Sequence, residues 1–266
     1  MAADPGEAGT ADDPRKGIQS VEIAMTVLLA LEQGHGPMSL TQIAAASGMG
    51  PSKMHRYLVS LGRVGLVSRS RSSGLYDMGP SLRRLGVESL RRTDNVGIAS
   101  EYLPDLRDRT KHAVNLAIWG DHGPVIVRWD YGSYALPITV RVGATMPMLS
   151  SSIGRVYLAY LPETLTGPAL TAQAAAADQP SLTPTEIEAI TAVVRRDGVA
   201  LTSGGVVPGV TSVAAPVFTT GETLPLVIAI AMPAAQATEA AISAVTTELR
   251  KTAGAISAEL GHLSGS

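Results

Sequence analysis

The chain has 266 residues, of which 45% are hydrophobic, and its formal net charge at pH 7 is −2. This length favours two domains with packed cores, and the lack of cysteine excludes disulfides and thiolate metal sites. The sequence shows no signal peptide and no apolar run near the ~20 residues of a membrane span, so we expect a cytoplasmic protein without a membrane partner.

The net charge is unevenly distributed along the chain. Residues 1–14 carry four acidic side chains and no basic one. Residues 15–92 carry eleven Lys and Arg against four Asp and Glu, whereas residues 93–266 carry ten against fifteen. A basic segment followed by an acidic one predicts one domain that binds nucleic acid and another that does not.

The amino-terminal part of the chain divides into a tail and a helix. Residues 1–16 lack hydrophobic periodicity and are rich in Ala, Gly, Asp and Pro, so we expect a disordered tail. From Ile18 to Gln33, apolar residues recur at helical spacing, which predicts an amphipathic helix.

Residues 39–67 predict two short helices joined by a tight turn. Ser39 and Gln42 have the spacing of a capping box at the start of the first helix. Gly48 stands where a left-handed residue ends that helix, and Pro51 suits the first position of the second. The second helix has one apolar stripe, formed by Met54, Leu58 and Leu61.

This pair of helices meets the requirements of a helix-turn-helix motif, whose second helix presents polar donors to a major groove. Two strand-like runs, Leu66–Arg69 and Leu75–Met78, flank a tip rich in Ser, Gly and Arg, which predicts a β-hairpin wing. No acidic residue occurs between Glu32 and Asp77. A surface that faces phosphates must lack acidic residues, because carboxylates would repel the DNA backbone. The alternative is an ordinary helical hairpin with a solvated basic side.

Arg56 is the strongest candidate for a base contact, because its guanidinium can donate two hydrogen bonds to one guanine. The other candidates lie in three places. Those on the same helix could contact bases or phosphates, those at the start of the preceding helix are placed to contact phosphate, and those on the wing would contact the DNA backbone or the minor groove. They are Ser52, Lys53, His55, Tyr57, Thr41, Gln42, Arg69 and Arg71. For each of them, the alternative is an exposed polar residue that contacts no DNA.

The predicted domains are a winged helix-turn-helix DNA-binding domain over residues 17–79, a linker helix over 80–92 and a second domain over 93–266. The apolar side of the linker helix needs a partner, for which a second copy of the chain is suited. Within the second domain we expect helices over 95–109, 150–161, 183–196 and 235–263, and strands over 112–119, 124–131, 138–142, 199–202, 212–218 and 224–232. Thr183 and Glu186 have the spacing of a capping box at the start of the third helix, and Thr238 is the expected cap of the last helix. Residues 170–177 are alanine-rich and weakly specified. Helices and strands that are segregated in this way favour an α+β fold with an antiparallel sheet.

Two stretches of the second domain resemble the IclR family of bacterial transcription regulators. One is VRVGATMPMLSSSIGRVYLAYLP, residues 140–162, and the other is Gly198-Val199-Ala200 followed by PGVTSVAAPVF, residues 208–218. The resemblance extends from about Gly17 to Leu263. It implies a winged-helix head, a linker helix and a C-terminal effector-binding domain, in which helices flank a curved antiparallel sheet and the pocket lies in its concavity.

Carried over by position, the resemblance assigns effector binding to one loop and to the strands that face it. These residues are Ser151, Ser152, Ile153, Gly154, Thr202, Ser212, Ala229 and Ala231. Family members that bind small carboxylates tend to have serines where this chain has its two alanines, so we expect a more apolar pocket for an aromatic or hydrophobic acid. Trp119 and Trp129 are candidate pocket walls, with ordinary core packing as the alternative.

The expected function is that of a sequence-specific DNA-binding transcriptional regulator. A small-molecule effector, an organic or aromatic acid, would alter its affinity for a double-stranded DNA operator. The resemblance implies a homodimer or a homotetramer, and repression and activation both stay open. We expect no catalytic residue, metal or cofactor, because no G-x-S-x-G elbow and no ligand spacing of histidines occurs. The alternative is a ligand-binding protein or an enzyme with a vestigial winged-helix head.

Overall fold

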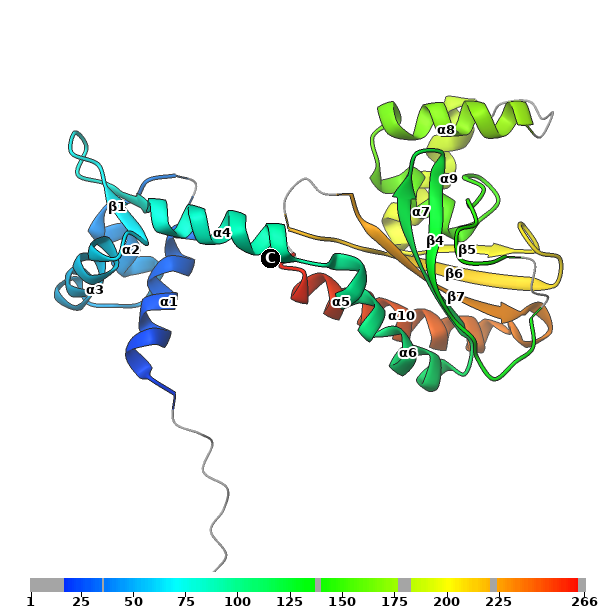
Figure 1. Cartoon of the computed structure of the whole chain (residues 1–266), viewed down its shortest axis with the longest axis horizontal. Coiled ribbons are helices and arrows are strands. Elements are labelled where there is room, and N and C mark those ends of the chain that lie inside the picture. Colours follow the sequence, from blue (N-terminus) through cyan, green and yellow to red (C-terminus); the bar gives the residue numbers. More distant parts are fainter. Residues whose placement is uncertain (1–16, 35, 137–139, 177–182, 221–223, 263–266) are drawn as a thin grey trace, which may run out of the picture. The chain divides into compact units, whose positions relative to one another are not determined.

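The computed structural model describes residues 17–34, 36–136, 140–176, 183–220 and 224–262. The chain forms two compact units, Met1–Thr93 and Asp94–Ser266 (Figure 1). No helix in these described ranges has the length and apolar character needed to cross a membrane. The predicted tail, residues 1–16, lies outside the described residues.

The first unit is a winged helix-turn-helix head with one further helix. Its elements are α1 (Gln19–Glu32), α2 (Leu40–Ala46), α3 (Pro51–Arg63), the antiparallel pair β1 (Val67–Arg69) and β2 (Tyr76–Met78), and α4 (Pro80–Arg92). The wing is therefore confirmed, and α4 spans the residues predicted for the linker helix.

Local chemistry accounts for the boundaries of α2 and α3. Ser39 and Gln42 form the predicted capping box: Gln42 N donates to Ser39 Oγ over 3.3 Å, and Ser39 N donates to Gln42 Oε1 over 2.8 Å. Gly48 has the predicted left-handed conformation, with φ +65°. The predicted apolar stripe of α3 is buried against α1 and the wing: Met54, Leu58 and Leu61.

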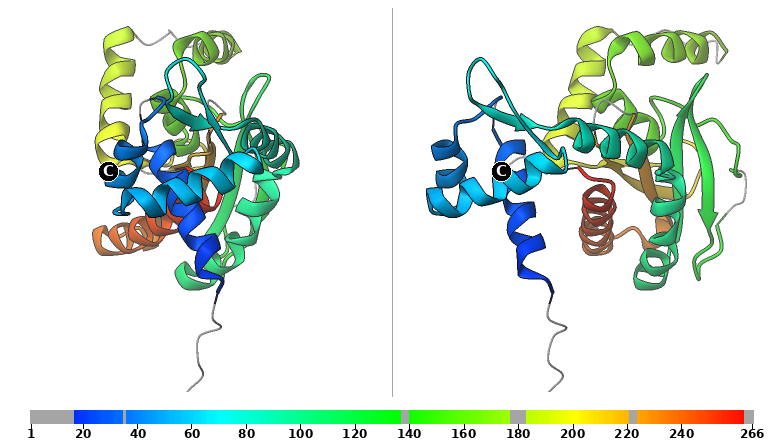
Figure 2. Two further views of the ribbon diagram at one scale, coloured as in Figure 1. Left: turned by 90° about the vertical axis from the view of Figure 1, so that its left-hand side faces the viewer. Right: turned by 60° about the vertical axis from the view of Figure 1, so that its left-hand side comes forward.

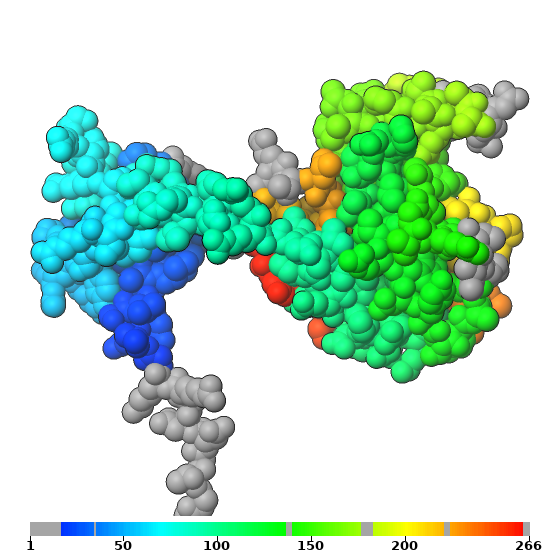
Figure 3. Space-filling model, viewed as in Figure 1, coloured from blue at the N-terminus to red at the C-terminus, as the bar shows by residue number. Residues whose placement is uncertain are grey.

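Helix α4 has no buried residue in the described chain, and Figure 3 shows it at the surface. Leu85, Val87 and Leu90 are 56%, 60% and 58% exposed. A helix with this apolar side gains little from packing within its own chain.

The second unit contains a five-stranded antiparallel sheet with the strand order β4-β3-β7-β6-β5. Its strands are β3 (Ala113–Gly120), β4 (Gly123–Asp130), β5 (Ala200–Ser203), β6 (Val210–Val217) and β7 (Leu226–Pro233). Its helices are α5 (Asn95–Glu101), α6 (Leu103–Thr110), α7 (Ser152–Tyr160), α8 (Glu163–Ala176), α9 (Pro184–Asp197) and α10 (Glu239–Glu259). The predicted α+β class and antiparallel sheet are confirmed.

Side chains along each strand point alternately to the two faces of the sheet, so each face has its own hydrophobic core. Val114 and Leu116 of β3 belong to the core shared with α5, α6 and α10, whereas Ala117 belongs to the core shared with α7. Figure 1 shows the same division, with α10 on one face of the sheet and α7 on the other, and Figure 2 shows α10 against the sheet from two further sides.

Three predicted elements differ from the structure. The single helix predicted over 95–109 is two helices, α5 and α6, which meet at Tyr102 because Pro104 lacks the N–H that a continuous helix would need. Residues 140–142 form no strand but enter a turn in which Ala144 N donates to Arg141 O over 3.0 Å. The rest of that predicted strand, residues 138 and 139, lies outside the described ranges.

The third difference is the C-terminal helix, which begins at Glu239 and not at residue 235. The predicted cap at Thr238 is present, because Ala241 N donates to Thr238 Oγ1 over 3.2 Å. The alanine-rich residues 170–176, for which the sequence specified no clear element, belong to α8, which begins at Glu163. The capping box predicted at Thr183 is present at the start of α9.

Candidate DNA-binding surface and ligand cavity

The exposed side of α3 is the candidate DNA-binding surface. Ser52, Lys53, His55 and Arg56 are exposed there, and Tyr57 is partly buried. They lie off the buried stripe because successive residues of a helix rotate by about 100°. Arg63 follows Arg56 by two turns, so it lies on the same side, and it is exposed as well. Arg63 adds a cation that the predicted set lacks.

Four of the predicted residues share one hollow beside α1. Ser52, Lys53, Arg56 and Tyr57 line it together with Ala24 of α1. The two cations therefore lie next to each other on a concave part of the head, a shape and charge suited to a phosphate backbone.

The two arginines of the wing have different surroundings. Arg69 Nε donates a hydrogen bond to Gly74 O over 3.0 Å, and its guanidinium carbon lies 5.3 Å from the centre of the Tyr76 ring. Arg69 thus holds the two sides of the hairpin together, whereas Arg71 is exposed at the tip.

The predicted residues of α2 take part in the start of that helix. The Thr41 hydroxyl lies 3.0 Å from the Ser39 hydroxyl, and Gln42 Oε1 accepts from Ser39 N. Both side chains are exposed. Any phosphate contact from Gln42 would come from its NH2 group, because its oxygen is engaged in the cap.

Helix α7 positions the second candidate site, on the face of the sheet opposite α10. Its cap is Ser151, whose Oγ accepts from Gly154 N over 2.8 Å and donates to Pro147 O over 2.5 Å. In the middle of the helix, the Tyr157 hydroxyl donates to Ala117 O of β3 over 3.0 Å. Burial raises the pKa of the Tyr157 phenol, so it stays a neutral donor.

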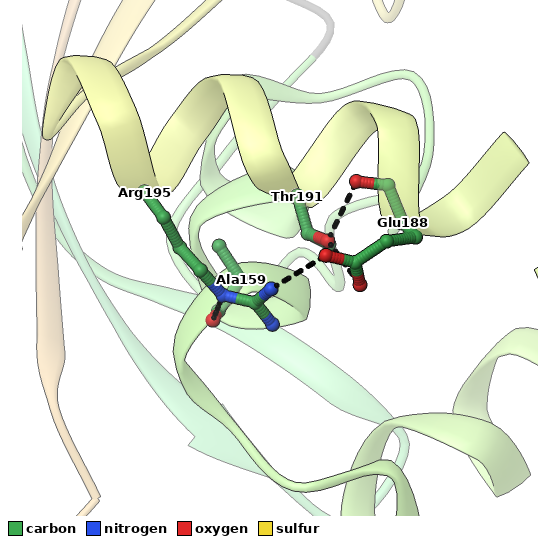
Figure 4. Close-up of polar contacts among 4 residues, drawn as sticks. All are labelled: Ala159, Glu188, Thr191 and Arg195. Atoms are coloured by element: carbon green, nitrogen blue, oxygen red, sulfur yellow. Dashed lines mark hydrogen bonds and ion pairs between the residues drawn. The ribbon is translucent and has the colours of Figure 1, made fainter. Parts of the chain in front are cut away.

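The carboxyl end of α7 is held by Arg195 of α9 (Figure 4). Arg195 Nε donates to Ala159 O over 2.8 Å, and Nη1 donates to Glu188 Oε1 over 3.1 Å. The Thr191 hydroxyl in turn lies within hydrogen-bonding distance of Glu188 O and Oε2, at 3.1 and 3.3 Å. A cation at this helix end satisfies a free carbonyl and complements the helix dipole, so α7 is fixed at both ends.

A cavity lies between the amino end of α7 and the sheet. It is lined by Asn115, Ile126, Trp129, Val140, Met146, Ser151, Ser152, Ile153, Thr202, Gly205, Val206, Val207, Val210, Ser212 and Ala231. None of these described lining residues is charged, and most are apolar. Ligand pockets of this kind combine an apolar wall with a few convergent polar groups.

The sheet register brings the polar lining residues from distant parts of the chain onto one face. Asn115 lies opposite Trp129 on β4, and Ser212 lies opposite Thr202 on β5. The Ser152 hydroxyl of α7 is 2.8 Å from the Ser212 hydroxyl, so the helix and the sheet meet at this point.

Six of the eight predicted effector residues line the cavity, and Gly154 and Ala229 do not. Gly154 lies against the preceding loop, where a Cβ would stand 2.3 Å from Pro147 O and 2.5 Å from Met148 Cα. Ala229 is fully buried in the core beneath α7.

Of the two tryptophans predicted as pocket walls, only Trp129 is among the described lining residues of the cavity. Trp119 packs against α7 instead, with its ring centre 5.4 Å from the ring centre of Tyr157. Asn115 was not among the predicted residues. Its signal in the sequence is a single polar residue inside the apolar run HAVNLAIW.

Comparison with known proteins shows two family matches. Residues 87–258 match the model described as "Bacterial transcriptional regulator IclR C-terminal", and residues 20–71 match the "IclR helix-turn-helix domain". The Glycerol operon regulatory protein of Streptomyces coelicolor is 27% identical over 202 residues, which are 76% of this chain and 80% of that protein.

Solved structures show the same fold. The crystal structure of Pseudomonas aeruginosa HmgR is 29% identical, has a TM-score of 0.83, and aligns over 93% of this chain and 100% of that one. An IclR homolog from Microbacterium hydrocarbonoxydans, solved in complex with 4-hydroxybenzoate, is 18% identical with a TM-score of 0.53, over 91% of this chain and 99% of that one.

Proposed function

Because this chain belongs to the IclR family of DNA-binding bacterial transcriptional regulators, we propose that it binds a specific operator and that a small-molecule effector alters this binding. In this proposal α3 and the wing contact the DNA, and the cavity beneath α7 holds the effector. The matching family is one of transcriptional regulators, not enzymes, and the Streptomyces relative is named a regulatory protein.

The observation that carries the DNA-binding part is the exposed side of α3. It presents Lys53, Arg56 and Arg63, and the chain has no acidic residue between Glu32 and Asp77 that would repel phosphate. Arg56 is the proposed base contact. Ser52, Lys53 and His55 are proposed to contact bases or phosphates. Thr41 and Gln42 are proposed to contact phosphates, and Arg69 and Arg71 the backbone or the minor groove.

The observation that carries the effector part is the uncharged cavity at the amino end of α7. The first amides of a helix have no intrahelical acceptor and favour an anion, so an organic acid can bind there without a basic side chain. The apolar remainder of the lining suits an aromatic or hydrophobic acid. The bound 4-hydroxybenzoate of the Microbacterium homolog belongs to the same chemical class.

We also propose that the protein is a homodimer joined through its heads, with a tetramer as the larger alternative. The support is apolar side chains that the head leaves exposed: Ile18, Val21 and Met25 of the α1 region and Leu85, Val87 and Leu90 of α4. A second copy of this surface would cover them.

Fluorescence anisotropy tests the proposal. The full-length protein is titrated into labelled DNA from upstream of its own gene and into a shuffled duplex of equal length, at near-physiological salt. We expect saturable binding that prefers the upstream DNA and changes when organic acids are added. Equal affinity for both duplexes would contradict operator binding and favour the ligand-binding protein with a vestigial head.

A further inference from the structure

We propose that Asn115 and Trp129 select the effector, and that they select a hydroxy-substituted monocarboxylic acid. This inference rests on the proposed function, because it concerns the same cavity. It assigns the distal end of the ligand to two strand residues that lie away from the α7 loop.

The two residues are neighbours on the sheet. Asn115 of β3 lies directly opposite Trp129 of β4, and both line the cavity. Residues opposite each other on antiparallel strands have Cβ atoms about 4.5–5.5 Å apart. Their side chains are therefore close enough to contact the same ligand group.

Both side chains hold a buried polar atom without a partner. Asn115 is only 3% exposed, and neither its Oδ1 nor Trp129 Nε1 has a hydrogen-bond partner among the described residues. On its other side Asn115 faces Ala229 of β7, whose methyl group offers no partner. Such groups are uncommon in folded proteins because each one costs free energy, so a pair of them at one cavity wall points to a ligand.

The chemistry of the pair defines the ligand group. Trp129 Nε1 can only donate a hydrogen bond, and Asn115 Oδ1 can only accept one. A hydroxyl satisfies both, since its oxygen accepts from the indole while its proton is donated to the amide oxygen. A carboxylate could only accept, and an ammonium group could only donate.

In the sheet, β7 separates β3, which carries Asn115, from β6, whose Ser212 lies beside α7. This second end of the cavity suits a carboxylate. The amides of Ser152 and Ile153 stand in the first turn of α7, where helix geometry provides no acceptor, and the helix dipole favours negative charge. The Ser152 and Ser212 hydroxyls, 2.8 Å apart, lie at the same end. A carboxylate at α7 and a hydroxyl at Asn115 together define a hydroxy acid.

The first test is isothermal titration calorimetry on the full-length protein with matched acids. The pairs are glycolate and acetate, 4-hydroxybutyrate and butyrate, and 4-hydroxybenzoate and benzoate. We expect at least one hydroxy acid to bind at least ten-fold more tightly than its partner. In Asn115→Val and Trp129→Phe this ratio should fall below about three-fold, with the acid that lacks the hydroxyl bound as before. Equal affinities in every pair, no binding in any pair, or a ratio that survives in both variants would overturn the proposal.

The second test needs no ligand. If Asn115 is unpaired in the free protein, then Asn115→Val should raise the melting temperature. The matched control is Ser257→Ala, because the buried Ser257 hydroxyl is paired: it donates to Ala253 O over 2.7 Å and accepts from Phe218 N over 3.0 Å. The control should lower the melting temperature. A fall of similar size in Asn115→Val would show that Asn115 is paired and would overturn the inference.

Operator binding separates this inference from the proposed function. If a hydroxy acid binds with the expected selectivity but leaves DNA affinity unchanged, the regulatory proposal fails and the selectivity of the cavity stands. If both acids of a pair change DNA affinity equally, the regulatory proposal stands and the role of Asn115 and Trp129 is refuted.

Discussion

Side chains along α3 divide between the core of the head and the exposed surface. Met54 and Leu58 are buried, whereas Lys53 and Arg56 between them are exposed. Because this division follows from helical periodicity, it was predictable from the sequence. Which exposed side chain contacts a base depends on the operator, which no pattern in the chain specifies.

We expect Arg56→Ala to weaken operator binding by about 1–3 kcal/mol and to relax specificity at one base pair, because a bidentate contact to guanine is lost. Anisotropy titrations against the operator and its single-base variants measure both effects. Arg128→Ala is the matched control, since Arg128 is an exposed arginine on β4 of the second unit. Unchanged operator affinity in Arg56→Ala would refute the assignment.

Gly154 is the residue with the least space at the amino end of α7. A Cβ there would stand 2.3 Å from Pro147 O and 2.6 Å from Met148 O, and both are backbone atoms that cannot rotate away. We expect Gly154→Ala to lower the free energy of unfolding by about 1–3 kcal/mol, as other overpacked sites do, and to weaken effector binding. Chemical denaturation and calorimetry measure the two effects.

The control for this glycine is Gly254→Ala in α10, where a Cβ would meet no heavy atom within 4 Å. Alanine is the better helix former, so this variant should be neutral or more stable by about 0.5–1 kcal/mol. If the two substitutions changed the free energy of unfolding equally, the close packing of α7 on residues 147 and 148 would not be the reason that position 154 requires glycine.

At the scale of elements, local signals were the ones that the sequence predicted well. The capping boxes at Ser39 and Thr183 and the left-handed Gly48 depend only on residues within a few positions, and all three are present. The pairing of Asn115 with Trp129 depends on strand register across a hairpin, so no local pattern indicated that these two side chains meet in the cavity.

The same distinction between local and long-range signals explains the elements that were predicted incorrectly. The break at Tyr102 followed from Pro104, which the apolar spacing of residues 95–109 masked. Residues 140–142 have the apolar character of a strand, but a turn at Gly143, with φ +88°, takes them out of the sheet. Apolar periodicity alone does not specify which segments pair.

Helix α4 supports a prediction about assembly. We expect the double variant Leu85→Glu/Leu90→Glu to be monomeric under conditions in which the parent chain is dimeric, because carboxylates would be buried in the shared surface. Multi-angle light scattering measures the mass of each. Ser89→Glu, an exposed change on the same helix, should stay dimeric. A dimeric double variant would place the dimer surface elsewhere.

At the scale of the whole molecule, the two candidate sites belong to different compact units, and their charges differ. The basic residues 15–92 include the DNA-binding surface, whereas residues 93–266, which include the cavity, carry more acidic than basic side chains. No residue of the described cavity lining belongs to the candidate DNA-binding surface. We therefore expect any influence of one site on the other to come from conformations that the two ligands bind unequally.

Thermodynamic linkage makes this quantitative. If an effector changes operator affinity by a given factor, saturating operator must change effector affinity by the same factor, and typical couplings are about 5- to 150-fold. Calorimetric titration of the effector with and without an operator duplex measures this factor. Arg56→Ala is the control, because it should bind effector normally and lose the response to DNA at concentrations that saturate only the parent chain. The two titrations could also disagree, with operator affinity depending on effector while effector affinity does not depend on operator. That result would mean that they report different sites or different oligomers.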